Sequence, residues 1–230
     1  MLENSGAVMT MRKFWDFYDE GDERVLYLEG VIAEESWFGD ETTPAAFKAE
    51  LNKGKGNITV FVNSPGGDVF AAAEIYTALK EYSASRGKVT VKISAIAASA
   101  ASVIAMSGDE VLMSPVACIM LHNPSTIAIG DADEMVRAKE MLDQVKQTII
   151  NAYQLKSGQP RDLISEMMDA ETWLYAQDAI ELGFADGMLY DENRKPSDRL
   201  KNMIYTRQAV SASFFERLQH RPAPPPKIMR

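Results

Sequence analysis

A serine, a histidine and a pair of glycines have the types and the order that an acyl-transfer site needs. Ser99 lies in a run of small residues, and its hydroxyl becomes a good nucleophile only when a base removes its proton. His122 is the candidate base, because the only other histidine, His220, lies in a proline-rich stretch. Gly66 and Gly67 allow the close backbone approach that an oxyanion hole requires. These residues predict acyl transfer.

Other serines offer alternative nucleophiles. Ser64 precedes a proline in a predicted turn and is explained as a turn hydrogen-bonding residue. Ser102 could return a hydrogen bond to a backbone carbonyl one helical turn back. Ser99 stands at the start of a predicted helix, where the helix dipole helps to stabilise an oxyanion, and we therefore favour it. The remaining candidates are Ser94 and Ser107.

A carboxylate should orient the histidine and stabilise its charged form. Asp169 and Glu171 precede an apolar segment that begins at Trp173. Their spacing does not choose between them, and either is also compatible with a solvated loop acid.

Alternating strands and helices must position these residues. Short connections between them indicate an α/β fold with right-handed crossovers. The candidate residues follow the carboxyl ends of strands, where open α/β sheets bind ligands. The predicted strands are 25–32, 58–62, 89–94, 110–113 and 118–121, and the predicted helices are 45–52, 69–82, 99–106, 131–156, 161–168 and 173–183.

Composition excludes several classes of function. The net charge of -9 argues against nucleic acid as a partner, because phosphate binding depends on clustered Lys and Arg. One cysteine, Cys118, allows no intramolecular disulfide and fits a reducing compartment. The longest apolar stretch, 93–106, is too short for a membrane span, and residues 1–10 do not resemble a secretion signal. We expect a cytoplasmic protein with no membrane partner.

The chain divides into three parts. Residues 1–24 are predicted to form an N-terminal arm, and 25–190 a single catalytic domain. Residues 191–230 are polar and finally proline-rich, which is typical of a flexible tail. Within the domain, the helix at 131–156 carries a long apolar stripe that must be buried on the core or on another subunit.

Four motifs resemble the proteolytic subunit of the Clp protease family, the ClpP-like serine peptidases. Asn63–Gly67 matches that family's Asn-Ser-Pro-Gly-Gly element, and Ala97–Ala101 matches its Ala-Ala-Ser-Met-Ala nucleophile motif. Met120–Pro124 corresponds to Met-Ile-His-Gln-Pro, and Ala176–Asp186 to Ala-x-Glu-Ala-x-Glu-Tyr-Gly-Leu-Ile-Asp. The similarity runs in consistent order over roughly 25–188.

The resemblance implies roles for individual residues. Ser99 would be the nucleophile and His122 the general base, with the amides of Gly67 and Ala100 forming the oxyanion hole. The family has its catalytic aspartate where this chain has Glu171. Three interpretations stay open. Glu171 takes the role through its longer side chain, Asp169 takes the role instead, or the third member of the triad contributes little. No metal and no organic cofactor are implied.

The resemblance also implies a fold and partners. The fold is the ClpP/crotonase-like one, with repeated β-β-α units and a long protruding handle helix. The partners are a polypeptide substrate and further copies of the chain, in a hexameric or heptameric ring that stacks through the handle. The segment that docks an AAA+ ATPase in Clp peptidases has no clear match in residues 1–24, which leaves ATPase partnership open.

Three short sequence segments resemble the Clp-like proteases of tailed phages and prophages, which are linked to head maturation. They are 37–44, 67–72 and 169–173. We therefore expect a protease that cuts capsid or scaffold proteins in the bacterial host cytoplasm or in the phage prohead.

Two competing hypotheses belong to other classes. A crotonase-like enzyme would hold an acyl-CoA thioester enolate with paired amides, and the Ser99 and His122 pair argues against it because that chemistry needs no nucleophilic serine. A structural ring protein that lost efficient catalysis is the other, and Glu171 is the residue that keeps it open.

Overall fold

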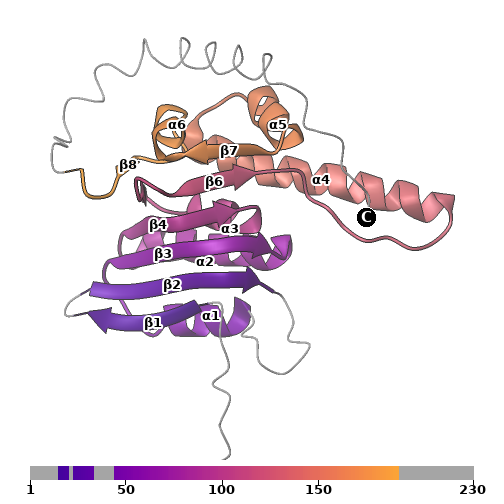
Figure 1. Ribbon diagram of the computed structural model, residues 1–230. Coiled ribbons are helices and arrows are strands. Elements are labelled where there is room, and N and C mark those ends of the chain that lie inside the picture. Colours follow the sequence, from indigo (N-terminus) through magenta and orange to yellow (C-terminus); the bar gives the residue numbers. More distant parts are fainter. Residues whose placement is uncertain (1–14, 21–22, 34–43, 192–230) are drawn as a thin grey trace, which may run out of the picture. The chain divides into compact units, whose positions relative to one another are not determined.

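The computed structural model describes residues 15–20, 23–33 and 44–191, which Figure 1 draws in colour. Most of the predicted N-terminal arm lies outside these residues, and so does the predicted tail at 191–230 apart from Asp191. The segment 37–44, which resembles the phage proteases, also lies outside the described residues, except for Pro44.

One mostly parallel sheet organises the domain and confirms the α/β prediction (Figure 1). The first strand pairs antiparallel with the second, and the later neighbours along this path are parallel. The first strand falls within the segment predicted as an arm. In spatial order the strands are β1 (Trp15–Glu20), β2 (Glu23–Ile32), β3 (Ile58–Gly67), β4 (Val89–Ala98), β5 (Glu110–Met113) and β8 (Gly187–Met188).

Strand β4 forks between two neighbours. Its first half, Thr90–Ile93, pairs with β5, and its last three residues, Ile96–Ala98, pair with β6 (Cys118–Leu121). Strand β6 also pairs antiparallel with β7 (Thr172–Tyr175). The fork brings the end of β6 beside the end of β4.

The described residues form six helices around the sheet, and two of the long ones begin at aspartate caps. The Asp68 side chain accepts hydrogen bonds at the start of α2, and Asp131 does so at the start of α4. Gly158, with φ of 69°, ends α4 in the left-handed conformation that favours glycine. The helices are α1 (Pro44–Leu51), α2 (Val69–Ser85), α3 (Ala100–Ala105), α4 (Ala132–Ser157), α5 (Arg161–Asp169) and α6 (Ala176–Glu181).

The core lies between the central strands and helices α2 and α3. Both faces of a parallel sheet are usually covered, so its strands read as nearly continuous apolar runs. All six residues of α3 are buried, and their small size lets this helix lie inside the protein. Buried side chains of the central strands include Ile58, Val60, Val62, Val89, Val91 and Ile93.

Helix α4 packs on the core only at its C-terminal end. Ile149 and Tyr153 are buried, whereas Met135, Val136 and Met141 are exposed. In Figure 1 the helix extends past the edge of the sheet. The apolar stripe predicted along this helix is therefore only partly covered by the other described residues.

One predicted helix is wrong in its first part. The segment 173–183 was expected to be helical throughout, but Thr172–Tyr175 is strand β7 and only Ala176–Glu181 is helix α6. A four-residue apolar run fits either state by pattern alone, and here pairing with β6 decides it. Strands β3 and β4 also continue past their predicted ends at Val62 and Ser94, because β2 and β6 offer partners to those residues.

Candidate active site

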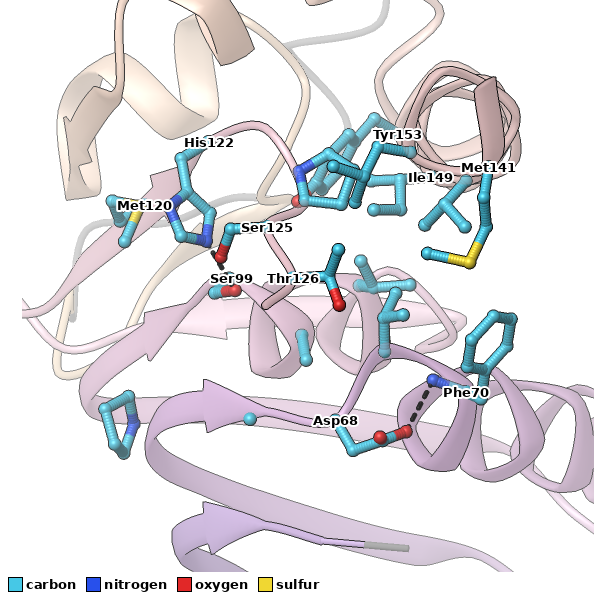
Figure 2. A pocket seen from close by; sticks show the side chains of 18 residues that line it. Asp68, Phe70, Ser99, Met120, His122, Ser125, Thr126, Met141, Ile149 and Tyr153 are labelled. Atoms are coloured by element: carbon cyan, nitrogen blue, oxygen red, sulfur yellow. Dashed lines mark hydrogen bonds between the residues drawn. The ribbon is translucent and has the colours of Figure 1, made fainter. Parts of the chain in front are cut away.

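Ser99 and His122 meet beyond the ends of β4 and β6. Ser99 N donates to Met120 O at 2.9 Å, which continues the pairing of these strands by one residue. His122 follows two residues later, and its Nε2 lies 2.7 Å from Ser99 Oγ (Figure 2). The fork in β4 thus joins two side chains that are 23 residues apart.

The backbone of Ser99 is strained. Its φ of 54° and ψ of -125° are rare for a residue with a side chain. The residue makes the turn from β4 into α3, and such outliers concentrate at functional sites. Gly66 lies against this turn. A Cβ at residue 66 would stand 2.6 Å from Ala98 O and 2.8 Å from Ser99 Cβ, which is too close. Glycine at 66 therefore makes room for the turn at Ser99.

Two backbone amides lie beside the pair. Asp68 N donates to Ile32 O at 2.9 Å, so the preceding amide, that of Gly67, points away from β2 in a parallel ladder. Ala100 is the first residue of α3, where backbone N–H groups have no partner within the helix. Both residues line the same cavity as Ser99 and His122, so the four residues predicted for these roles come together.

Glu171 lies next to His122 in strand register without a hydrogen bond to it. The antiparallel pairing of β6 and β7 ends at Leu121 and Thr172, and one further step would set His122 opposite Glu171. Glu171 instead has φ of 48° and is exposed. Its Oε1 accepts a hydrogen bond from Trp173 Nε1 at 3.4 Å.

Asp169 is held by other partners. Its Oδ1 accepts from Lys146 Nζ on α4 and from Asn123 Nδ2, each at 2.7 Å. The bonds from Lys146 and then Asn123 lower the pKa of Asp169 below its ordinary value. Within the described residues, then, neither predicted acid bonds to the imidazole, and Asp169 ties α4 and α5 to the segment that follows His122. Sequence reasoning missed Lys146 and Asn123, since nothing local marks them.

All four alternative serines donate hydrogen bonds to backbone carbonyl oxygens, and two of them lie next to the site. Ser64 Oγ donates to Gly30 O at 2.5 Å and accepts from Gly66 N at 3.1 Å. Ser102 Oγ donates to Ser99 O at 2.6 Å and lies 2.8 Å from the hydroxyl of Tyr153, whose pKa is raised by complete burial. The hydrogen bond from Ser102 therefore helps to hold the backbone of Ser99 in its conformation.

A cavity of about 450 Å³ opens beside Ser99 and His122 (Figure 2). The candidate pair lies at its polar side. The opposite wall comes from α2, α3 and α4 and is apolar: Val69, Phe70, Val103, Met141, Val145 and Ile149. A cavity of this size admits side chains of a bound peptide.

No cluster of three or more His, Cys, Asp or Glu side chains that could hold a metal ion occurs among residues 15–20, 23–33 and 44–191. In the same ranges, none of the helices has both the length and the apolar character needed to cross a membrane.

Comparison with known proteins places the chain in one family. Residues 22–192 match the family described as Clp protease. The chain is 31% identical over 190 residues to the ATP-dependent Clp protease proteolytic subunit 1 of Chlamydia muridarum, which covers 80% of this chain and 96% of the relative. The corresponding protein of Chlamydia pneumoniae is 33% identical over 147 residues, covering 61% and 75%. The Clp protease proteolytic subunit of Pleurastrum terricola is 31% identical over 129 residues, covering 55% and 64%.

The chain belongs to the Clp protease family. It is a serine peptidase, a hydrolase of peptide bonds, and the mixed α/β fold with its mostly parallel sheet agrees with that membership.

Proposed function

We propose that the protein is a serine endopeptidase that cleaves polypeptides through an acyl-enzyme at Ser99. The observation that carries this proposal is the 2.7 Å contact between Ser99 Oγ and His122 Nε2 on the wall of the cavity. A nucleophile within hydrogen-bond reach of its base is the signature of this chemistry.

The reaction uses the four assembled residues in turn. Ser99 Oγ attacks the scissile carbonyl carbon while His122 Nε2 takes the hydroxyl proton. The amides of Gly67 and Ala100 stabilise the negative oxygen of the tetrahedral intermediate. His122 then returns the proton to the leaving amine, and water attacks the acyl-enzyme with His122 again as the base.

Glu171 is the proposed third member of the triad. Two observations support it over Asp169. The register of β6 and β7, extended by one residue, points from His122 to Glu171. Asp169 Oδ1 already bonds to Lys146 and Asn123, whereas Glu171 has a single long bond from Trp173. To act as the acid, the Glu171 carboxylate must leave Trp173 Nε1 and bond to the imidazole.

The proposed biological role is capsid or scaffold processing by a phage or prophage head maturation protease. Its support is the resemblance of 67–72 and 169–173 to such proteases. We further propose a homo-oligomeric ring of six or seven subunits, in which α4 acts as the handle between stacked rings. The relatives are named proteolytic subunits, and the exposed apolar side chains of α4 suit a contact with another copy.

Fluorophosphonate labelling tests the proposal. Wild type, Ser99→Ala, Glu171→Ala and Asp169→Ala are treated with the reagent, and intact mass reports the adduct. We expect labelling to vanish in Ser99→Ala and to slow strongly in Glu171→Ala. A label that persists in Ser99→Ala would refute the assignment of the nucleophile.

A structural ring protein is the second candidate, and one observation favours it. Among the described residues the imidazole of His122 has no carboxylate partner, and without one the base is poorly oriented. A folded wild-type oligomer that never labels would support this candidate, or a peptidase whose site is aligned only by a partner.

A further inference from the structure

Asp68 gives the cavity beside Ser99 a negative charge. Among the described residues that line the cavity, it is the only carboxylate, and none is Lys or Arg. The other ionisable side chains that line it are those of His122, the candidate base, and Tyr153. A cationic group that enters this cavity can therefore pair with Asp68 and meets no lysine or arginine among the described lining residues.

The position of Asp68 is fixed by three hydrogen bonds. Its backbone N donates to Ile32 O at 2.9 Å, and its Oδ1 accepts from Phe70 N and Ala71 N at 2.8 Å each (Figure 2). The start of α2 favours a carboxylate anion in this place. The second oxygen, Oδ2, receives no hydrogen bond from the described residues. A half-buried, preorganised anion thus keeps one oxygen for a ligand.

The walls next to Asp68 are apolar. Val69 and Phe70 follow it directly, and Met141 faces them from α4 (Figure 2). Lys and Arg bury their methylene stems along apolar surfaces while the charged head finds polar partners. A short acidic side chain has neither the stem nor the charge for this cavity.

We propose that Asp68 is a specificity-determining residue, which makes the protease favour peptides that place a Lys or Arg side chain in the cavity beside Ser99 and reject Asp or Glu there. The inference rests on the proposed function, because the cavity selects substrates only if Ser99 is the nucleophile. It adds a substrate class to that function.

Asp68→Asn tests the charge without removing the cap. Asparagine is as good an N-cap as aspartate, so helix α2 should be retained. Asp131→Asn is the matched control, since Asp131 caps α4 through the same kind of bond and does not line the cavity. Wild type and both variants digest one mixture of proteome-derived peptides, with Ser99→Ala as background, and mass spectrometry identifies the residues around each cleaved bond.

We expect wild-type sites to be enriched in Lys or Arg over Asp or Glu at one position near the cleaved bond. Asp68→Asn should lower this enrichment about 1.5- to fivefold, in line with partly exposed ion pairs, and Asp131→Asn should leave it unchanged. The wild-type enrichment should also fall at high salt.

Two results would overturn the inference in distinguishable ways. Cleavage that depends on Ser99 but shows no basic enrichment, or an enrichment that Asp68→Asn preserves, would remove the role of Asp68 and leave the proposed function intact. If wild type and Ser99→Ala cleave the peptides equally, both the role of Asp68 and the proposed function are refuted.

Discussion

Ser99 keeps a strained backbone because its neighbours hold it on three sides. Its N–H bonds to Met120 O, its carbonyl accepts from Ser102 Oγ, and Gly66 makes room below it. Strained conformations of this kind cost about 1–3 kcal/mol and persist only where the surroundings enforce them. The hydroxyl of Ser99 is thereby directed at His122 before substrate arrives.

Ser102→Ala tests this support. The change removes the bond to Ser99 O and leaves the buried Tyr153 hydroxyl without its partner, so we expect a loss of about 1–3 kcal/mol in unfolding free energy. Ser107 is the matched control, because it is equally buried and its hydroxyl donates a single hydrogen bond within the described residues, to Ile104 O at 2.7 Å. Urea unfolding should show a larger loss for Ser102→Ala than for Ser107→Ala. Equal losses would contradict the coupling to Tyr153.

Gly67→Ala tests the oxyanion amide. A Cβ at this residue would stand 2.0 Å from Ile32 O, so the backbone must shift and take its N–H with it. Losing one oxyanion donor typically lowers the rate by about 10²–10³. The measurement is the rate of fluorophosphonate labelling, with circular dichroism to confirm the fold. A folded variant that labels at the wild-type rate would exclude Gly67 from the site.

Residue types were enough to bring Ser99, His122 and the glycine pair together as candidates, because each follows or ends a strand on one edge of the sheet. The role of Ala100 came from the family resemblance. The triad acid could not be chosen in the same way. The positive φ of Glu171 and the bonds of Asp169 to Lys146 depend on how distant elements pack. No local pattern encodes either one.

At the scale of elements, Asp169 links α5 to α4 and to the segment after His122. Its lowered pKa means that the folded state holds the carboxylate in its charged form. The resulting stabilisation is present above the unfolded pKa of about 3.9 and is lost as the pH falls through the lower folded value.

Asp169→Asn should therefore destabilise the protein at pH 7 and matter less near pH 3. We expect about 0.5–1 kcal/mol at neutral pH, a small value because the carboxylate is more than half exposed. Urea unfolding at both pH values measures the difference. In a double-mutant cycle, Asp169→Asn should cost less when Lys146→Met is already present. A cost that is the same at both pH values would argue against the ion pair.

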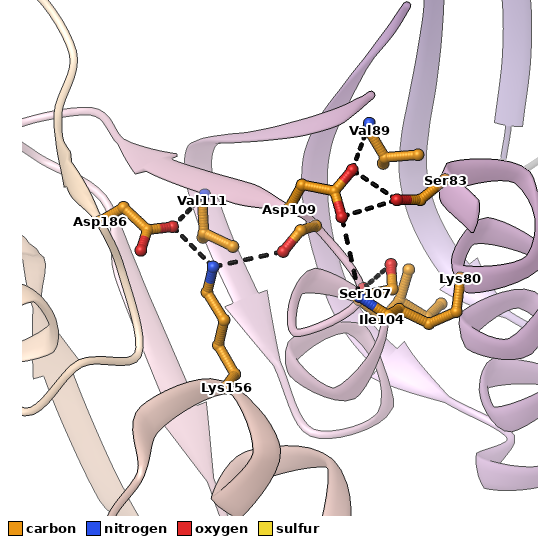
Figure 3. Close-up of polar contacts among 10 residues, drawn as sticks. Lys80, Ser83, Val89, Ile104, Ser107, Asp109, Val111, Lys156 and Asp186 are labelled. Carbon is orange, nitrogen blue, oxygen red and sulfur yellow. Dashed lines mark hydrogen bonds and ion pairs between the residues drawn. The ribbon is translucent and has the colours of Figure 1, made fainter. Parts of the chain in front are cut away.

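A second link ties β5 to its neighbours in the sheet (Figure 3). Asp109 accepts from Ser83 Oγ and from Val89 N, and Lys156 Nζ bridges Gly108 O and Asp186 Oδ2. Burial raises the pKa of Asp109, but the bonds from Ser83 and Val89 together with the charges of Lys80 and Lys156 outweigh it, and the net shift is downward.

Short elements were predicted well where the pattern was unambiguous. Strands β5 and β6 begin and end at the predicted residues, Glu110–Met113 and Cys118–Leu121. Strand β7 was missed because its four residues acquire their conformation from β6. The fork of β4 was not predictable either, since the sequence alone does not say which strand pairs with which half.

At the scale of the whole molecule, the exposed half of α4 is an apolar surface that the other described residues leave uncovered. Val136 is 53% exposed and Ile127, just before the helix, 91% exposed. Apolar side chains gathered in this way mark contact surfaces.

Met135→Glu combined with Val136→Glu should dissociate the proposed stacked rings. Each change sets a charge on a surface that we expect another copy to bury, which is costly without a partner charge. Sedimentation velocity should show a smaller species than wild type, whereas the control Glu140→Lys, at an exposed and already charged residue, should not change the size. A wild-type monomer would contradict the ring itself.

The order of the elements along the chain has a consequence for synthesis on the ribosome. The nucleophile, the base and the two oxyanion amides of the candidate site lie between Gly67 and His122, whereas one wall of its cavity belongs to α4, which ends at Ser157, and the proposed acid Glu171 comes later still. At about 5–20 residues per second, the 35 residues from 122 to 157 take about two to seven seconds. A nascent chain would thus contain its nucleophile and base before the cavity that binds substrate is complete. Stalled chains ending near residue 165 should react with the fluorophosphonate more slowly than the finished protein.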